Sequence, residues 1–526
     1  MNTEMMTILA LIVGSLAITW ICRRFDVSAP LVLVVVGIAV SFVPGVEIVE
    51  FDSETVLLLV LTPLLYSAAL ESSYLDIRAN VRPIGLLAVG LVAFTAVVVG
   101  LVAWWWVPEL TLPAALVLGA IVAPPDAVSA ISIGRRLGLP RRTMTILSGE
   151  SLVNDATSLT LFRVFLIVAG GTGITLLEAG GLFLFAAVGG TAIGYALAWI
   201  AHRIRRKLND PRVEAAFGLV VPFAVFIVGE LAHTSGVLAV VVAGLYLGYH
   251  SPESGYATRL QEQAVWQASD TILESIVFAL IGLQLTTVLR NVGEVGPLIV
   301  AGVVITAATV VARIVWVFPA TYVPRYLFRR IRERDPYPPW QVPAVISWAG
   351  MRGVVTLAAA FAIEPHDAPF RDTVVFLAFF VTVATLLLHG LTLPWLIRKL
   401  NVRETDSQAD LLAEAQTQYD AVQASIERLD ALVADVEIST TQHTAEKLRR
   451  MAQMSANGVW EQLGRSDEEA GESPNATYRR LRREMLREER ATFVARRDSG
   501  DIDDEILRRV LRRLDLEEAQ LARDEV

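Results

Sequence analysis

The chain has 526 residues, of which 54% are hydrophobic and 19% are charged, and its formal net charge is −9. A soluble protein of this length carries about 25% charged residues, so the composition excludes an ordinary soluble enzyme and indicates a polytopic membrane protein. The sequence contains no Gly-x-x-x-x-Gly-Lys-Ser/Thr phosphate loop and no basic patch outside the connections between apolar segments. With a single cysteine, Cys22, and no histidine-rich motif, it also offers no resident metal centre. We expect no use of ATP, no nucleic-acid partner, no enzymatic activity and no cofactor.

Apolar segments of about 20 residues, the length of a membrane-spanning helix, recur along the first 400 residues. We predict thirteen spans, at residues 6–22, 28–46, 54–71, 84–106, 112–133, 143–169, 176–201, 213–232, 235–249, 268–289, 296–324, 341–363 and 371–397. The predicted fold is therefore an all-α membrane domain over residues 1–400, followed by a helical tail over residues 401–526.

Basic residues occur in alternate connections between these spans. The basic connections contain Arg23 and Arg24; Arg78 and Arg82; Arg135, Arg136, Arg141 and Arg142; Arg203, Arg205, Arg206, Lys207 and Arg212; Arg325, Arg329, Arg330, Arg332 and Arg334; and Arg398 and Lys399. By the positive-inside rule these connections face the cytoplasm. Thirteen spans then place the N-terminus outside and the C-terminus in the cytoplasm of a multi-pass cell-membrane protein.

The tail holds 28 acidic and 19 basic residues, and its net charge of −9 equals that of the whole chain. Apolar residues within it follow the alternating three- and four-residue spacing of a coiled-coil seam: Leu412, Ala415, Tyr419, Val422, Ile426, Leu429, Val433 and Val436. Two interpretations are open, a helical domain that packs on itself and a dimerising or regulatory module.

The most informative motif is Gly-Glu-Ser-Leu-Val-Asn-Asp-Ala over residues 149–156, within the sixth predicted span. Glu150, Asn154 and Asp155 are costly at membrane depth unless they face a cavity or a partner, so they indicate a functional site. On a helix, Ser151 and Asp155 share one face, and Glu150 and Asn154 share the next. One face is available to a cation, and the other to the supporting structure.

A second motif, Ala-Pro-Pro-Asp-Ala-Val-Ser at residues 123–129, interrupts the fifth span. Pro124 and Pro125 remove two backbone donors and clash with the preceding turn, so we predict a broken helix. Freed carbonyls are tolerated at membrane depth where they line a cavity, as in the discontinuous helices of transporters. Asp126, next to the break, favours an ion site over a simple proline kink.

The third motif is Ser-Trp-Ala-Gly-Met-Arg-Gly-Val at residues 347–354, in the middle of the twelfth span. Gly350 and Gly353 suggest local unwinding on either side of Arg352. A permanently charged arginine needs a carboxylate or carbonyl ligands at this depth. We predict a structural ion pair between Arg352 and Glu150.

These positions also suggest an internal repeat, with the seventh span connecting two six-span halves. Each half then starts on the opposite side of the membrane, which is the inverted repeat of secondary transporters. This inference depends on topology alone.

The three motifs together, in this order and at these spans, resemble the monovalent cation:proton antiporter-1 family, which contains bacterial and archaeal sodium/proton antiporters related to animal sodium/proton exchangers. The resemblance covers about residues 6–400. It implies an inverted-repeat fold with two discontinuous crossing helices, a mobile core domain, a dimerisation domain and a homodimer. It also implies that Asp155 binds both cation and proton, that Asp126 and Ser151 shape the site, and that Glu150 pairs with Arg352.

The chain departs from the family pattern in the third span, where some members carry a glutamate and this chain has Ser67. Directly before Asp126 this chain also has Pro125, where many members have a different residue. Further charged residues fall in or beside the spans, without an assigned part in the ion pathway: Glu71, Arg163, Glu230, Asp270, Glu274 and Arg313.

The sequence thus predicts a secondary antiporter that exchanges sodium, lithium or potassium for protons. Cation and proton compete at Asp155, with Asp126, Ser151 and Asn154 beside it, and the exchange is expected to be electroneutral. A cation channel and a membrane-anchored sensor are the alternatives. A channel would more naturally show a carbonyl filter or rings of charge, and a sensor would not need the intramembrane carboxylates.

Overall fold

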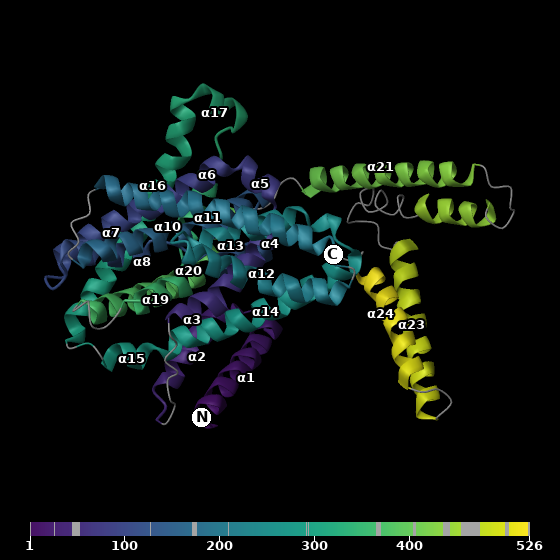
Figure 1. Ribbon diagram of the computed structural model, residues 1–526, viewed down its shortest axis with the longest axis horizontal. Coiled ribbons are helices and arrows are strands. Elements are labelled where there is room, and N and C mark those ends of the chain that lie inside the picture. Colours follow the sequence, from purple (N-terminus) through teal and green to yellow (C-terminus); the bar gives the residue numbers. More distant parts are fainter. Residues whose placement is uncertain are drawn as a thin grey trace. The chain divides into compact units, whose positions relative to one another are not determined.

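The computed structural model describes residues 2–25, 27–44, 53–126, 128–170, 176–208, 210–290, 292, 294–363, 370–402, 407–434, 442–453, 474–499 and 504–523. Every regular element in these ranges is a helix (Figure 1). The chain separates into two compact units, Met1–Glu404 and Thr405–Val526, and each is described by itself.

In the first unit, eight helices or helical runs among the described residues are long and apolar enough to cross a membrane. They are α1 (Asn2–Arg24), α6 (Val81–Gly85) continuing through η2 (Leu86–Leu91) into α7 (Val92–Trp106), α10 (Arg141–Ala169), α11 (Leu176–Arg205), α12 (Pro211–Leu231), α14 (Tyr256–Leu283) with α15 (Leu285–Arg290), α16 (Val295–Leu327) and α20 (Arg371–Leu400). The unit therefore has the all-α, multi-span character that the composition predicts.

Shorter helices complete the unit. The apolar ones are α2 (Ala29–Ser41), η1 (Leu57–Leu61) with α4 (Thr62–Glu71), α8 (Leu112–Val122), α13 (Gly236–Tyr249), α18 (Gln341–Trp348) and α19 (Val354–Phe361). The others are α3 (Ser53–Val56), α5 (Tyr74–Ala79), α9 (Val128–Leu137), η3 (Ser251–Glu253) and α17 (Arg329–Arg334). The exact number of thirteen spans and the inverted repeat stay predictions.

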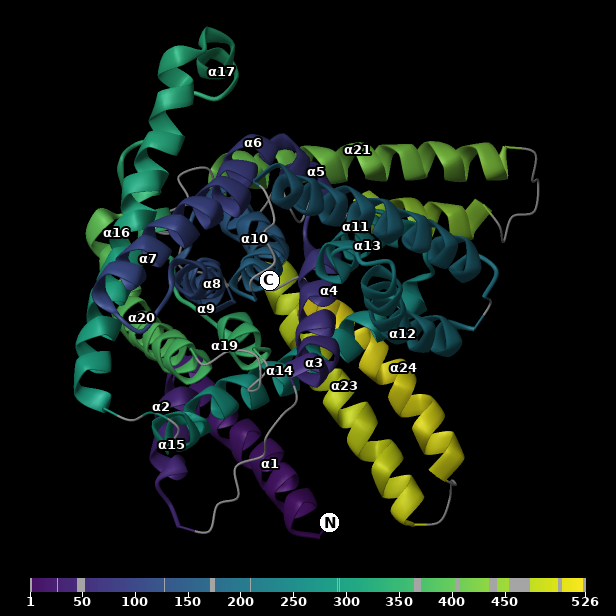
Figure 2. The same cartoon turned by 60° about the vertical axis from the view of Figure 1, so that its left-hand side comes forward.

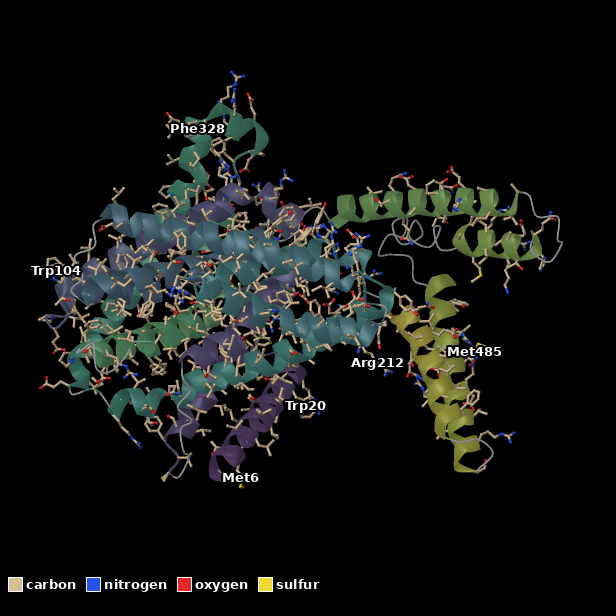
Figure 3. All side chains as sticks on the ribbon, in the orientation of Figure 1. Met6, Trp20, Trp104, Arg212, Phe328 and Met485 are labelled. Atoms are coloured by element: carbon tan, nitrogen blue, oxygen red, sulfur yellow. The ribbon has the colours of Figure 1, made fainter. Side chains whose placement is uncertain are left out.

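Large apolar side chains on the outside of this unit are exposed, as expected where lipid is the solvent. Figure 3 labels three of them, Met6, Trp20 and Trp104, which are 70%, 62% and 51% exposed. Trp104 begins a run of three tryptophans at the end of α7. Tryptophan is enriched where a membrane meets water, so this run is suited to anchor that end of the helix.

Small residues let several helices of the unit approach closely. A Cβ atom added to Gly119 of α8 would lie 2.9 Å from the backbone nitrogen of Gly100 in α7, and one added to Gly282 of α14 would lie 2.7 Å from that of Ile38 in α2. Such backbone-to-backbone contacts are typical of membrane helix pairs. Figure 2 shows α8 and α10 in the interior of the unit, with α7 and α19 around them. This packing fixes the elements that carry the polar motifs.

The second unit consists of α21 (Ser407–Val433), a helix at residues 442–453, α23 (Pro474–Asp498) and α24 (Asp504–Arg523). Leu486 of α23 packs with Leu514 and Leu521 of α24. The predicted seam lies on α21, except for Val436, which is outside the described residues. Ala415 on the seam is buried, whereas Leu412 and Tyr419 are exposed. A dimerising role of this seam stays one of the two interpretations given above.

Candidate cation site

The first broken helix runs from α8 to α9 and is interrupted at residues 123–126. Pro124 and Pro125 cannot donate backbone hydrogen bonds, and the chain leaves the helical path there. The Oδ1 atom of Asp126 accepts a hydrogen bond from the backbone N–H of Val128 at 2.9 Å, at the start of α9. The side chain of Asp126 is thereby fixed at the break.

A second broken helix contacts the first. Residues 349–353 are not helical and separate α18 from α19. The backbone N–H of Asp126 donates to the carbonyl oxygen of Met351 at 2.7 Å. A Cβ atom on Gly353 would lie 2.6 Å from the Cβ of Asp126, so only glycine permits this approach. The two interrupted segments, predicted from prolines in one case and glycines in the other, thus lie in direct contact.

The uninterrupted helix α10 lies against both broken helices. The Nδ2 atom of Asn154 donates to the carbonyl oxygen of Pro125 at 2.7 Å, and the hydroxyl of Ser158 donates to the carbonyl oxygen of Ala120 at 2.9 Å. Both bonds satisfy carbonyls at or near the end of α8, which lacks some of its intrahelical partners. Asn154 therefore supports the break rather than facing an open cavity, although its Oδ1 is buried without a partner among the described residues.

Asp155 follows directly and is 7% exposed. Its carboxylate lies close enough to Asp126 for the two charges to interact. No described residue donates a hydrogen bond to the carboxylate of Asp155. Ser151, which is half-buried, lies one turn earlier on the same face of α10. Two carboxylates with free oxygens beside broken helices form an arrangement that can bind a cation or a proton.

The predicted pair of Glu150 with Arg352 is wrong. Glu150 is bound by Arg313 of α16 through two bonds, Nη1 to Oε1 at 2.6 Å and Nη2 to Oε2 at 2.9 Å. Both side chains are 2% exposed. Such a bidentate pair satisfies the planar guanidinium and the carboxylate together. The Nε atom of Arg313 also donates to the carbonyl oxygen of Ile346 in α18, at 3.2 Å.

Arg352 instead binds carbonyl oxygens at the two breaks. Its side chain donates to Val122 at 3.0 Å, to Ala123 at 3.4 Å and to Gly350. Its backbone N–H donates to the hydroxyl of Thr385 at 3.2 Å. The C-terminal end of a helix has a partial negative charge, so a guanidinium at the end of α8 is favourable without a carboxylate. This geometry explains how a second arginine is accommodated there.

Two further carboxylates lie on one face of α14. Asp270 accepts a hydrogen bond from Ser67 of α4 at 2.6 Å. Glu274, one turn along, lies close enough to interact electrostatically with Asp270 and Asp126. It also lines a cavity of about 260 Å³ together with Arg23 and Val128. The cavity therefore reaches from α1 to the first residue of α9, beside the break.

The other charged residues noted in the sequence make contacts elsewhere or are exposed. Glu230 pairs with Arg163 at 2.7 Å, and Glu71 ends α4 in an exposed position. A buried network that the sequence analysis missed joins Arg205 to Glu214 at 3.2 Å and to Glu262 at 2.7 Å. These contacts are structural ion pairs, and none includes Asp126 or Asp155.

Comparisons with known proteins give a consistent result. Residues 8–399 match the family model for the transmembrane sodium/hydrogen exchangers. A protein of Mycobacterium tuberculosis named as an uncharacterized Na(+)/H(+) exchanger is 32% identical over 98% of this chain and 96% of its own length. The sodium, potassium, lithium and rubidium/H(+) antiporter of Bacillus subtilis is 31% identical over 72% of this chain and 59% of its own length.

A solved structure shows a similar fold. The sodium proton antiporter MjNhaP1 from Methanocaldococcus jannaschii aligns with a TM-score of 0.63 and 17% identity, over 76% of this chain and 99% of its own. At that identity the likeness concerns the fold alone.

Proposed function

Because this chain belongs to the sodium/hydrogen exchanger family, we propose that it is a secondary antiporter in which sodium and protons compete for Asp155. Lithium and potassium are further candidate cations. The observation that supports the proposal most directly is the position of Asp155, which is buried beside Asp126 and the two broken helices. No hydrogen-bond donor contacts its carboxylate among the described residues.

The chemistry follows from burial. An isolated carboxylate is costly away from water and is favoured when a proton or a cation neutralises it. Either one can occupy Asp155, and binding of one displaces the other. Asp126 and Ser151 are suited to supply further oxygen ligands to the cation, and Asn154 holds the break in place through Pro125.

The surrounding charges favour exchange of one cation for one proton. Glu150 is already neutralised by Arg313, and Arg352 keeps its proton at any accessible pH. Asn154, directly before Asp155, cannot carry a charge. Asp155 is then the one group that loses a proton when a monovalent cation enters, provided that Asp126 keeps its protonation state through the cycle.

Asp270 and Glu274 are suited to guide cations toward this site. A negative side chain in a cavity attracts cations, and Glu274 lines the cavity that reaches α9, with Arg23 and Arg136 also in its wall. Asp270 does not line this cavity but lies close enough to Glu274 to interact with it. Ser67 of α4 stands where some family members have a glutamate. Its hydroxyl donates a hydrogen bond to Asp270 of α14, so a carboxylate from another helix lies beside that position. We propose that the carboxylate absent from α4 is replaced in space by one on α14.

We further propose that the protein is a homodimer in the cell membrane with its N-terminus outside and its C-terminus in the cytoplasm. The distribution of basic residues supports the orientation. The tail, which forms a separate compact unit, is proposed to regulate or dimerise rather than to conduct ions.

The experiment that tests the site is exchange by purified protein in proteoliposomes, with internal pH followed as sodium, lithium or potassium is added. Asp155→Asn keeps the side-chain shape and removes the titrating group, so exchange should be lost while the protein stays folded. Asp372→Asn, at an exposed aspartate at the start of α20, is the matched control and should exchange normally. Sodium-driven proton flux in Asp155→Asn would refute the assignment.

The stoichiometry is tested in the same liposomes, clamped at different membrane potentials with potassium and valinomycin. For electroneutral exchange, the sodium gradient at which proton flux reverses should not depend on voltage. A reversal point that moves with voltage would show that more than one proton is carried for each cation.

A further inference from the structure

A cavity of about 150 Å³ lies between α6, η2, α10, α16 and α18, on the side of the unit whose loops are basic. Most of its wall is apolar and includes Leu86, Ile146 and Val317. The charged side chains that line it are all arginines: Arg82, Arg142 and Arg325. It thus combines an apolar interior with guanidinium groups.

The three arginines share one carboxylate. Asp335 accepts hydrogen bonds from Arg82 at 2.5 Å, from Arg142 at 2.7 Å and from Arg325 at 2.7 Å. The nearby Asp76 contacts Arg141 instead, at 3.3 Å. Arginine keeps its charge at any accessible pH, so the cluster has more positive than negative charge. The Nη1 atom of Arg82 is buried and has no hydrogen-bond partner among the described residues.

A helix N-terminus adds to this positive field. The helix α10 begins at Arg141 without a side-chain cap, and Pro140 and Thr143 beside its first turn line the cavity. Uncapped N–H groups at the start of a long helix favour an anion. The arginine cluster and the N-terminus of α10 therefore both suit a phosphate group. The apolar wall suits a hydrocarbon chain instead.

We propose that this cavity binds an anionic phospholipid of the cytoplasmic leaflet. The phosphate interacts with the three arginines that line the cavity, and part of one acyl chain lies against the apolar wall. Arginine binds phosphate strongly through charge-assisted hydrogen bonds, and the apolar wall accounts for a lipid rather than a free anion. The proposal rests on the orientation proposed above but not on transport.

The cavity is adjacent to the buried pair that supports the cation site. Ile146 lies one helical turn before Glu150 on α10, and Val317 lies one turn after Arg313 on α16. Ile346, which also lines the cavity, provides the carbonyl that accepts the Nε–H of Arg313. A bound lipid would therefore stabilise the elements that hold Glu150 and Arg313 together.

The test measures thermal unfolding of the delipidated, full-length protein in detergent. Phosphatidylglycerol, phosphatidylcholine with the same acyl chains, and glycerol 3-phosphate are each titrated, and native mass spectrometry counts the lipids retained. We expect phosphatidylglycerol to raise the unfolding temperature and to remain bound, and phosphatidylcholine and glycerol 3-phosphate to have little effect.

Three variants locate the effect. Arg82→Gln should weaken the apparent affinity for phosphatidylglycerol roughly tenfold, the equivalent of one hydrogen bond to a charged group. Ala320→Trp keeps all three arginines but fills the apolar part of the cavity, and should weaken binding as well. Arg330→Gln, at an exposed arginine of α17, is the control and should behave as the wild type.

Equal responses of the wild type to phosphatidylglycerol and phosphatidylcholine would overturn the proposal, as would unchanged phosphatidylglycerol binding in both Arg82→Gln and Ala320→Trp. If glycerol 3-phosphate stabilises the wild type as well as phosphatidylglycerol does, a lipid is not the required occupant. Since none of these measurements involves ion exchange, their failure is distinct from failure of the proposed antiport.

Discussion

Replacing Arg313 by methionine should destabilise the protein strongly, because it leaves the Glu150 carboxylate buried without its bidentate partner. Both side chains are 2% exposed. Removing one member of a buried ion pair costs about 3–5 kcal/mol, or roughly two to four powers of ten in the ratio of folded to unfolded protein. The bond from Arg313 to Ile346 is lost as well, at a further cost of about 1 kcal/mol.

The double variant Glu150→Leu/Arg313→Met distinguishes this cost from lost packing. Apolar replacement of a whole buried pair is often neutral, so we expect the second substitution to restore much of the stability that the first removed. The parallel cycle with Glu150→Leu and Arg352→Met should show a smaller coupling, because Arg352 binds carbonyl oxygens. Stability is measured by tryptophan fluorescence during denaturation in mixed micelles.

The reasoning is refuted if Arg313→Met is as stable as the wild type. It is also refuted if Glu150 couples more strongly to Arg352 than to Arg313, since the pair inferred from the sequence would then be the real one.

The remaining predictions concern Gly353, Asp335 and the tail. Gly353→Ala should cost about 1–3 kcal/mol through overlap with Asp126 and should impair exchange, whereas Gly296→Ala, with nothing within 4 Å of the added atom, should have little effect on thermal stability or flux. Although burial raises the pKa of Asp335, hydrogen bonds from Arg325 and Arg142 lower it overall. The stabilising effect of the Asp335 carboxylate should therefore be complete above the ordinary aspartate pKa of about 4. It should disappear as the pH falls through the lowered pKa of the folded state. The thermal stabilities of Asp335→Asn and the wild type should therefore differ at neutral pH and converge in acid. Truncation after residue 404 should leave exchange measurable in proteoliposomes, and complete loss of flux in a folded truncation would show that the tail takes part in transport.

The sequence was sufficient to predict the broken helix at residues 123–126, because two adjacent prolines cannot continue a helix. It also predicted the interruption around Arg352, since glycines flank a charge there. The partner of Glu150 could not be predicted, because both Arg313 and Arg352 lie in apolar spans and either could neutralise it. That choice depends on how α10, α16 and the second broken helix are placed against one another, which no local pattern specifies.

The contact between Ser67 and Asp270 could not be predicted for the same reason. Ser67 lies on α4 and Asp270 lies on α14. The sequence showed only that position 67 lacks the glutamate of some family members and that Asp270 had no assigned role. A search for carboxylates on other helices that could replace the missing one would have drawn attention to Asp270 and Glu274. The distance of 2.6 Å between the two side chains comes from packing alone.

The contact between the two breaks also has a consequence for biosynthesis. The carbonyl groups of Val122 and Ala123 are bound by Arg352, and the N–H of Asp126 is bound by Met351, more than 220 residues later in the chain. While the ribosome is making the intervening helices, these groups lack the partners that they have in the complete molecule. The proposed cation site includes these contacts, so it can be complete only after Met351 and Arg352 have been translated.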